Sequence, residues 1–227
     1  MTALQIFAAL ITNPRRAFAE IEKNPRFAVP MIVLLVCTVG VVVWFYASID
    51  IDSFINKTLA GRGLNAAQRA QAAAFMTRNT LMGSALIGGI LGLFVIQLVE
   101  AFYFFFIYEF LDVRKSFRQW FAFTWWCGLP QVISAVATAV LLLLGHSAAS
   151  VDVLSPFSLN ALFYHFDPDD SGYSLLNSIT LVQPLSIVLM VIGARTWSER
   201  SWVLSGVVVI LPRLLLYGAW AWFVFLR

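Results

Sequence analysis

The residues with the most chemical potential are a carboxylate and a guanidinium that lie within long apolar segments. Glu100 is the one formal charge in residues 81–108, and Arg213 is the one formal charge in residues 203–226. Either charge alone inside a bilayer would cost at least ~2.5–3.5 kcal/mol, and pairing offsets part of that cost. Measured along a helix, Glu100 lies ~8–9 Å and Arg213 ~2 Å from the segment centre, toward the same face. We therefore predict that the two segments pack together with Glu100 facing Arg213.

Three glutamines lie at a similar depth in the predicted spans, namely Gln97, Gln131 and Gln183. Two of them, and Arg213, adjoin a proline, which leaves a helical carbonyl without its usual N–H donor. One interpretation is that these side chains hydrogen-bond between the helices of a kinked bundle. A second is a midplane site for an ion, a proton or a small polar solute. A third is an isolated, protonated Glu100, and the sequence leaves all three open.

An acidic run at residues 165–172, HFDPDDSG, partly imitates a calcium-binding EF-hand loop. The first, third, fifth and sixth positions of such a loop would be Asp167, Asp169, Ser171 and Gly172. The twelfth position, where that loop needs a glutamate, is Ser178. We interpret the run from Asp167 to Asp170 as an acidic turn and expect no metal there.

Enzymatic chemistry finds little support in the remaining residues. The two histidines, His146 and His165, both fall in the loop between the third and fourth apolar segments. The sequence contains no Gly-x-Ser-x-Gly, His-Glu-x-x-His or phosphate-cradling glycine motif. We therefore expect a protein without catalytic residues, cofactor or metal.

The composition places these residues in a membrane protein. Of 227 residues, 60% are hydrophobic and 12% are charged, whereas a soluble domain averages about 25% charged residues. In such a chain the basic residues mostly set the orientation and contact anionic lipid, and the net charge of +3 does not indicate nucleic acid. The elements that position Glu100 and Arg213 are therefore transmembrane helices.

Five apolar segments are predicted to span the membrane: residues 28–48, 81–108, 121–144, 173–193 and 203–226. The fourth contains Pro184 and the fifth contains Pro212. We expect both to remain single helices, because proline is tolerated when neighbours satisfy the freed carbonyl. The predicted fold is all-α, an integral membrane bundle of five transmembrane helices with short interfacial helices. The membrane domain comprises residues 28–227, and residues 1–27 form a cytoplasmic region of interfacial helices.

The apolar stretch from Thr2 to Ile11 is too short to cross the bilayer. Leu4, Phe7 and Ile11 recur at helical spacing, which predicts a helix lying at the membrane interface. Asn13 followed by Pro14 then favours a new helix, because asparagine suits the N-cap and proline the first helical position.

The basic residues predict the orientation. Nine Lys and Arg residues lie in the N-terminal region and the second and fourth loops, against five on the other side. The positive-inside rule then places the N-terminus in the cytoplasm and the C-terminus outside a cell inner (plasma) membrane. The predicted cytoplasmic basic surface consists of Arg15, Arg16, Arg114, Lys115 and Arg118.

Three stretches resemble the Yip domain family, the Ypt/Rab-interacting membrane proteins, in its bacterial branch. They are NPRRAFAEIEKNPRFAVP before the first span, FAFTWWCGLPQ at the opening of the third, and SLNALF between the third and fourth. The resemblance implies a five-span helical bundle with a cytoplasmic N-terminus. Eukaryotic members are linked to vesicle traffic and to prenylated small GTPases, but their Asp-Leu-Tyr-Gly-Pro motif is missing here. The resemblance therefore implies only a general role as a membrane-embedded organising or adaptor protein.

The leading functional hypothesis is a non-enzymatic membrane protein that organises partners or lipid. Its expected partners are the bilayer, anionic lipids, and a membrane-protein partner or a second copy of itself. The alternative hypothesis is a small transporter, or an ion- or proton-conducting protein, that uses Glu100 and Arg213.

Overall fold

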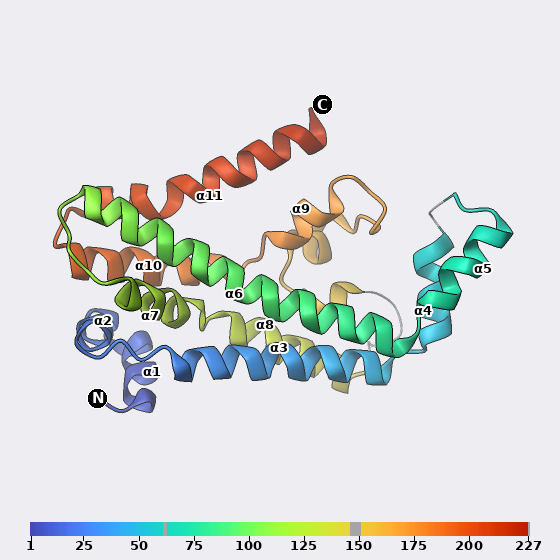
Figure 1. The fold of residues 1–227 in the computed structure, drawn as a ribbon, viewed down its shortest axis with the longest axis horizontal. Helices are drawn as coiled ribbons and strands as arrows, with labels where there is room; N and C mark the ends of the chain where they lie inside the picture. The colour runs from blue at the N-terminus through green and yellow to red at the C-terminus, as the bar shows by residue number, and fades with distance from the viewer. Residues whose placement is uncertain (61–62, 146–150, 227) are drawn as a thin grey trace. The chain divides into compact units, whose positions relative to one another are not determined.

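The computed structural model describes residues 1–60, 63–145 and 151–226 (Figure 1). Within them the regular structure is helical, apart from one isolated antiparallel bridge between Ser158 and Thr180. The α-helices are α1 (Ala3–Thr12), α2 (Pro14–Lys23), α3 (Ala28–Ser48), α4 (Ile51–Ala60), α5 (Ala66–Phe75), α6 (Arg78–Phe110), α7 (Phe117–Gly128), α8 (Gln131–Leu143), α9 (Tyr173–Ser178), α10 (Gln183–Ser198) and α11 (Trp202–Phe225). A 3₁₀-helix, η2 (Val151–Leu154), and a π-helix, η3 (Asn160–Tyr164), lie between α8 and α9.

Four helical segments among the described residues are long and apolar enough to cross a membrane: α3, α6, α11, and α7 with α8 taken together as Phe117–Leu143. These agree with four of the five predicted spans, and the predicted all-α membrane class is confirmed. The α7–α8 segment is interrupted at Leu129 and Pro130. Pro130 lacks an N–H group, so α7 ends before it and α8 begins after it.

The expectation of a single helix over residues 173–193 is wrong. The segment contains α9 and the beginning of α10, which are separated in the sequence by residues 179–182. Residues 179–182 form backbone hydrogen bonds with residues 157–159. The N–H of Leu181 donates to Phe157 O, and the N–H of Leu159 donates to Ile179 O, both at 2.9 Å. Pro184 then occupies the first turn of α10, where its missing N–H costs nothing. That the whole segment crosses the bilayer remains a prediction.

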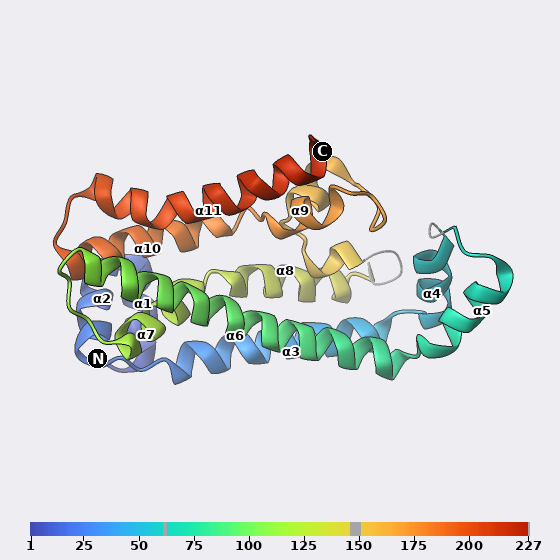
Figure 2. The ribbon, with the colours of Figure 1, turned by 45° about the horizontal axis from the view of Figure 1, so that its top comes forward.

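The described chain divides into two compact units. The first comprises Met1–Leu35, Gly92–Gln131 and Val182–Ala219, and the second comprises Val36–Leu91, Val132–Leu181 and Trp220–Arg227. The predicted cytoplasmic helices α1 and α2 are therefore part of the first unit. In that unit α2 packs against α7 and α10, as both views show (Figures 1 and 2).

The N-terminal helices begin where the sequence predicts. The side chain of Asn13 accepts the N–H of Arg16, and Pro14 is the first residue of α2. A second cap precedes α1, where Thr2 and Gln5 form a reciprocal capping box. The start of α2 predicted from Asn13 and Pro14 is confirmed.

An aromatic core fills the first unit between α2, α6, α7 and α10. Neighbouring ring centroids lie 4.8–6.3 Å apart, and the core consists of Phe18, Phe104, Tyr108, Trp120, Phe123 and Trp197. Gly193 makes room for it, because a Cβ atom at this position would lie 2.5 Å from a ring carbon of Phe123. The core fixes α2, and with it the basic residues that α2 carries, against α7 and α10.

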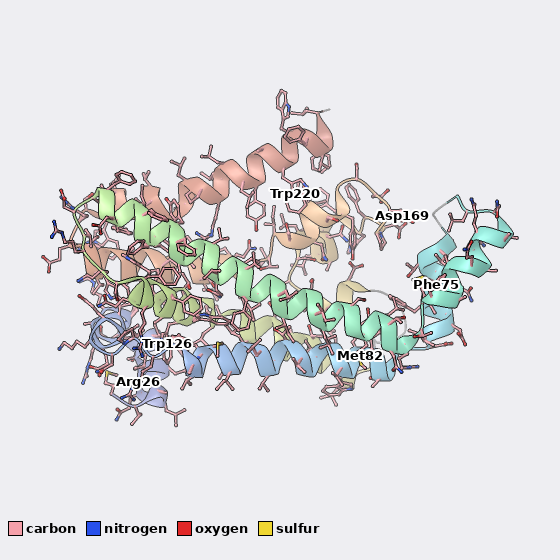
Figure 3. The ribbon with its side chains drawn as sticks, in the orientation of Figure 1. Arg26, Phe75, Met82, Trp126, Asp169 and Trp220 are labelled. Atoms are coloured by element: carbon pink, nitrogen blue, oxygen red, sulfur yellow. The ribbon has the colours of Figure 1, made fainter. Side chains whose placement is uncertain are left out.

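The second unit is held by two polar side chains. Arg78, at the start of α6, donates to the carbonyls of Tyr46 and Ile49 at the end of α3. Between these two helices in the sequence, α4 and α5 pack on each other, and Phe75 at the end of α5 is largely exposed (Figure 3).

The second of these polar side chains is Asn160, which is fully buried. It donates to Phe166 O at 3.1 Å and accepts the N–H of Phe166 at 2.9 Å. This amide therefore fixes the fold of the segment between η3 and α9.

Candidate functional site

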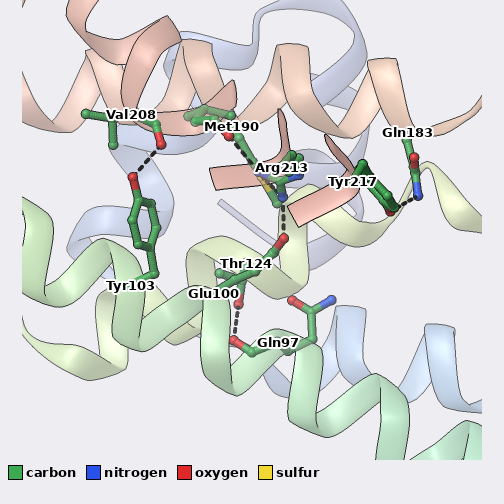
Figure 4. Close-up of polar contacts among 10 residues, drawn as sticks. Gln97, Glu100, Tyr103, Thr124, Gln183, Met190, Val208, Arg213 and Tyr217 are labelled. Carbon is green, nitrogen blue, oxygen red and sulfur yellow. Dashed lines mark hydrogen bonds and ion pairs between the residues drawn. The ribbon is translucent and has the colours of Figure 1, made fainter. Parts of the chain in front are cut away.

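Glu100 on α6 and Arg213 on α11 form an ion pair in the first unit (Figure 4). Each side chain is 24% exposed. The guanidinium of Arg213 also donates to the carbonyl of Val209 at 2.9 Å and lies 3.1 Å from the sulfur of Met190 on α10. The pairing expected from the depths of the two charges is present, and Arg213 connects three helices.

The carbonyl freed by Pro212 is satisfied by a residue that the sequence reasoning missed. Pro212 lies inside α11 and has no N–H to give to Val208, four residues earlier. The hydroxyl of Tyr103 on α6 donates to Val208 O at 2.7 Å (Figure 4). Tyr103 follows Glu100 by three residues, so both project from the same side of α6. This three-residue spacing is the sequence signal that could have placed Tyr103 beside Glu100.

The other two prolines do not free a helical carbonyl, which corrects the sequence interpretation. Pro130 precedes the first residue of α8, and Pro184 is the second residue of α10. N–H groups in the first turn of a helix have no intrahelical acceptor in any case. The idea that each proline needs a polar neighbour therefore holds for Pro212 alone.

The three predicted glutamines lie in different environments. Gln183 Nε2 donates to the hydroxyl of Tyr217, which lies one turn beyond Arg213 on α11, at 3.1 Å (Figure 4). Gln97 lies one turn before Glu100 on α6 and is 5% exposed, and its side-chain oxygen is buried without a donor among the described residues. Gln131 is the first residue of α8. The three glutamines therefore do not form one cluster: Gln183 bonds to α11, and Gln97 lies one turn from Glu100.

Gln97 also marks a close approach of α6 and α7. Its backbone carbonyl accepts the hydroxyl of Thr124 at 3.3 Å. A Cβ atom on Gly128 would lie 2.8 Å from Gln97 Nε2. The absence of a side chain at Gly128 therefore leaves space for the amide of Gln97. The side-chain oxygen of Gln97 accepts no hydrogen bond within the described part of the chain.

The acidic run is organised by its own backbone. The Asp170 carboxylate accepts the N–H of Asp167 at 2.8 Å, and His165 adopts a left-handed conformation with φ of 54°. His146 lies outside the described residues. Among the residues that the structure describes, no group of three or more His, Cys, Asp and Glu could hold a metal ion.

The predicted basic surface lies on α2, on the loop between α6 and α7, and on the first turn of α7. Arg15, Arg16, Arg114 and Arg118 are exposed. Lys115 is partly buried and forms an ion pair with Glu22 of α2. The structure thus joins the N-terminal region to the second loop.

Two tryptophans anchor the N-terminal region further. Trp197 Nε1 donates to Phe18 O at 2.8 Å, and Trp126 Nε1 donates to Arg26 O at 2.9 Å (Figure 3). These indoles come from α10 and α7. The backbone of residues 18–26 is therefore held by side chains from two of the helices it packs against.

The model of the Yip1 domain matches residues 8–225, nearly the whole chain. The chain belongs to the Yip1 domain family. No curated protein and no solved structure matches it. Family membership and the four apolar helices together make this Yip1-domain protein a multi-pass membrane protein.

The three stretches that resembled the family have structural roles in this Yip1 domain. Residues 13–30 supply α2 and the two carbonyls that bind tryptophans. Residues 121–131 supply Phe123, in the aromatic core, and Trp126. Residues 158–163 contain the buried amide of Asn160. The three stretches that carry the resemblance to the family therefore contribute packing and hydrogen bonds to the fold.

Proposed function

We propose that this Yip1-family protein is a non-enzymatic organiser that gathers partner proteins or anionic lipid at the cytoplasmic face of a cell inner membrane. The observation that carries the proposal is the fixed presentation of Arg15, Arg16, Arg114 and Arg118. The aromatic core holds α2 in place, and the Lys115–Glu22 pair ties it to the second loop. A rigid set of exposed cations attracts acidic partner surfaces and anionic headgroups.

The orientation assigned to this surface has two supports. The N-terminal region and the second and fourth loops carry nine of the basic residues, which favours the cytoplasmic side. These three segments also meet in the first unit, where Arg200 of the fourth loop donates to Leu111 O of the second at 2.6 Å. We propose that this end faces the cytoplasm and that the C-terminus lies outside.

Proximity crosslinking in cells and in nanodiscs tests the proposal. We expect an Arg114→Gln/Arg118→Gln variant to lose most of its crosslinked partners and to recruit less anionic lipid. The matched control is Lys57→Gln/Arg69→Gln, which removes two exposed cations from the second unit. An unchanged crosslinking pattern in the Arg114/Arg118 variant would contradict an organising role for the basic surface.

A second function, conduction of a proton or small polar solute, is favoured by one observation. The buried oxygen of Gln97, one turn from Glu100, has no donor among the described residues, and an acceptor of this kind could bind a proton donor or a polar solute. Proteoliposome flux assays separate the two functions. Loss of a pH-driven flux in Glu100→Gln would support conduction, whereas no flux together with intact partner crosslinking would support the organiser.

A further inference from the structure

Two arginines from different helices lie at the same tryptophan, where α11 begins. Arg15 Cζ on α2 lies 5.3 Å from the ring centroid of Trp202, and Arg195 Cζ on α10 lies 4.8 Å from it. Both distances are within the range of a cation–π contact. Among the described residues, neither guanidinium has a carboxylate within ion-pair distance. Two like charges are thus brought to one aromatic ring without an ion-paired carboxylate from the described part of the chain.

One donor at this position has no hydrogen-bond acceptor among the described residues. The Nε atom of Arg195 is buried and has no acceptor within the described part of the chain. A buried donor without a partner carries a penalty that a bound acceptor would remove. The site therefore needs an anion both for its charge and for its hydrogen bonds.

The start of α11 adds a favourable backbone dipole. Ser201 caps this 24-residue helix by accepting the N–H of Leu204 at 3.2 Å. The remaining N–H groups of the first turn have no intrahelical acceptor, and the N-terminal end of the helix dipole is positive. Guanidinium groups beside such a helix end match the donor pattern that binds phosphate.

The surrounding apolar surface places the site at the level where acyl chains give way to headgroups. Helix α1 packs one side on α2 and exposes Leu4, Phe7 and Ile11 by 83%, 44% and 76%. Trp202 is 43% exposed and is followed by the more exposed Val203. Tryptophan favours the boundary between the hydrocarbon and the polar region. An anion at this depth is most readily the phosphate of a lipid.

We propose that Arg15, Arg195 and Trp202 bind the phosphodiester of one anionic glycerophospholipid at the N-terminus of α11. The inference rests on the proposed function in taking this end of the first unit as the cytoplasmic face. It adds a defined site to a surface whose other cations, Arg16, Arg114 and Arg118, act through diffuse attraction. Arg195 and Trp202 were not among the residues singled out from the sequence.

Native mass spectrometry of the full-length protein in detergent tests the site, with phosphatidylglycerol as the probe and phosphatidylcholine as the uncharged comparison. We expect one tightly bound phosphatidylglycerol. Affinity should fall about fivefold for Arg15→Gln or Arg195→Gln and about 25-fold for the double variant. The Arg15→Lys/Arg195→Lys variant, which keeps the charge, should recover part of the loss. Lys57→Gln/Arg69→Gln should bind as the unmodified protein does.

Three outcomes would overturn the site. Equal binding of the two lipids by the unmodified protein would do so even if a variant fails to fold. Displacement of the lipid by millimolar inorganic phosphate would identify a site for a soluble anion instead. Loss of binding in Arg114→Gln/Arg118→Gln, but not in Arg15→Gln/Arg195→Gln, would remove this site and leave the proposed organising surface standing.

Discussion

Removing both members of the Glu100–Arg213 pair should destabilise the protein no more than removing one of them. In Glu100→Leu the guanidinium of Arg213 keeps its contacts with Val209 O and Met190 but loses its counter-charge within the membrane. Breaking a fully buried pair from one side costs about 3–5 kcal/mol. Because each side chain is 24% exposed, we expect a smaller loss, of about 2–3 kcal/mol in the free energy of unfolding.

The double variant Glu100→Leu/Arg213→Leu isolates the pair. Neither charge then remains in the membrane, so we expect this variant to be about as stable as the better of the two single variants. The corresponding coupling free energy is about 2 kcal/mol, within the range found for contacting residues. Gln131→Leu is the control at similar depth outside the pair, and it should change stability by less than about 0.5 kcal/mol.

Reversible unfolding in mixed micelles, followed by tryptophan fluorescence, measures all four variants, since the chain has 8 tryptophans. Additive losses, with the double variant as unstable as both single changes combined, would refute mutual shielding of the two charges. The same result would remove the reason for α6 and α11 to pack in this register. It would also favour a reading in which Glu100 is protonated and interacts with something other than Arg213.

The remaining predictions concern single contacts and use the same measurement. Tyr103→Phe should cost about 1 kcal/mol, because it leaves a carbonyl unpaired, and the cost should shrink when Pro212→Ala restores an N–H donor; an equal cost in both backgrounds would contradict this. Gly193→Ala should cost about 1–3 kcal/mol by crowding the aromatic core, whereas Gly206→Ala, with open space around its Cβ, should not. Asn160→Ala should lose both hydrogen bonds to Phe166 and about 2 kcal/mol, and normal protease resistance of that segment would argue against its role.

The sequence was informative where one local property decides the structure. Apolar length alone located four spans, and Asn13 with Pro14 located the start of α2. It failed over residues 173–193, because the break there depends on backbone hydrogen bonds to Phe157 and Leu159 that no local pattern reports. The prolines correctly indicated that the regular helix is disturbed nearby. They did not indicate whether the helix ends there or continues with a carbonyl that lacks its N–H donor.

The candidate site divides in the same way. Glu100 and Arg213 could be paired because a charge in an apolar span has few alternatives, and depth along a helix follows from residue number. The spacing from Glu100 indicates the side of α6 on which Tyr103 lies, but it does not identify the partner of its hydroxyl. The hydroxyl of Tyr217 likewise has no partner that the sequence identifies, because tyrosine occurs in transmembrane helices whether or not its hydroxyl forms a hydrogen bond. Arg195 and Trp202 lie on consecutive helices, and their approach depends on the turn between them. Contacts between neutral aromatic and polar groups thus need the tertiary structure.

The position of the polar contacts bears on the choice between organising and conducting functions. Val208, Arg213 and Tyr217 on α11 each bind a side chain from α6 or α10, so α11 is held at three successive levels. A solute that used Glu100 would have to compete with Arg213 for the carboxylate, which requires α11 to shift and its other two contacts to loosen. The exposed cations at the end of the first unit need no such movement. These three contacts within the membrane therefore support the proposed organising function over conduction.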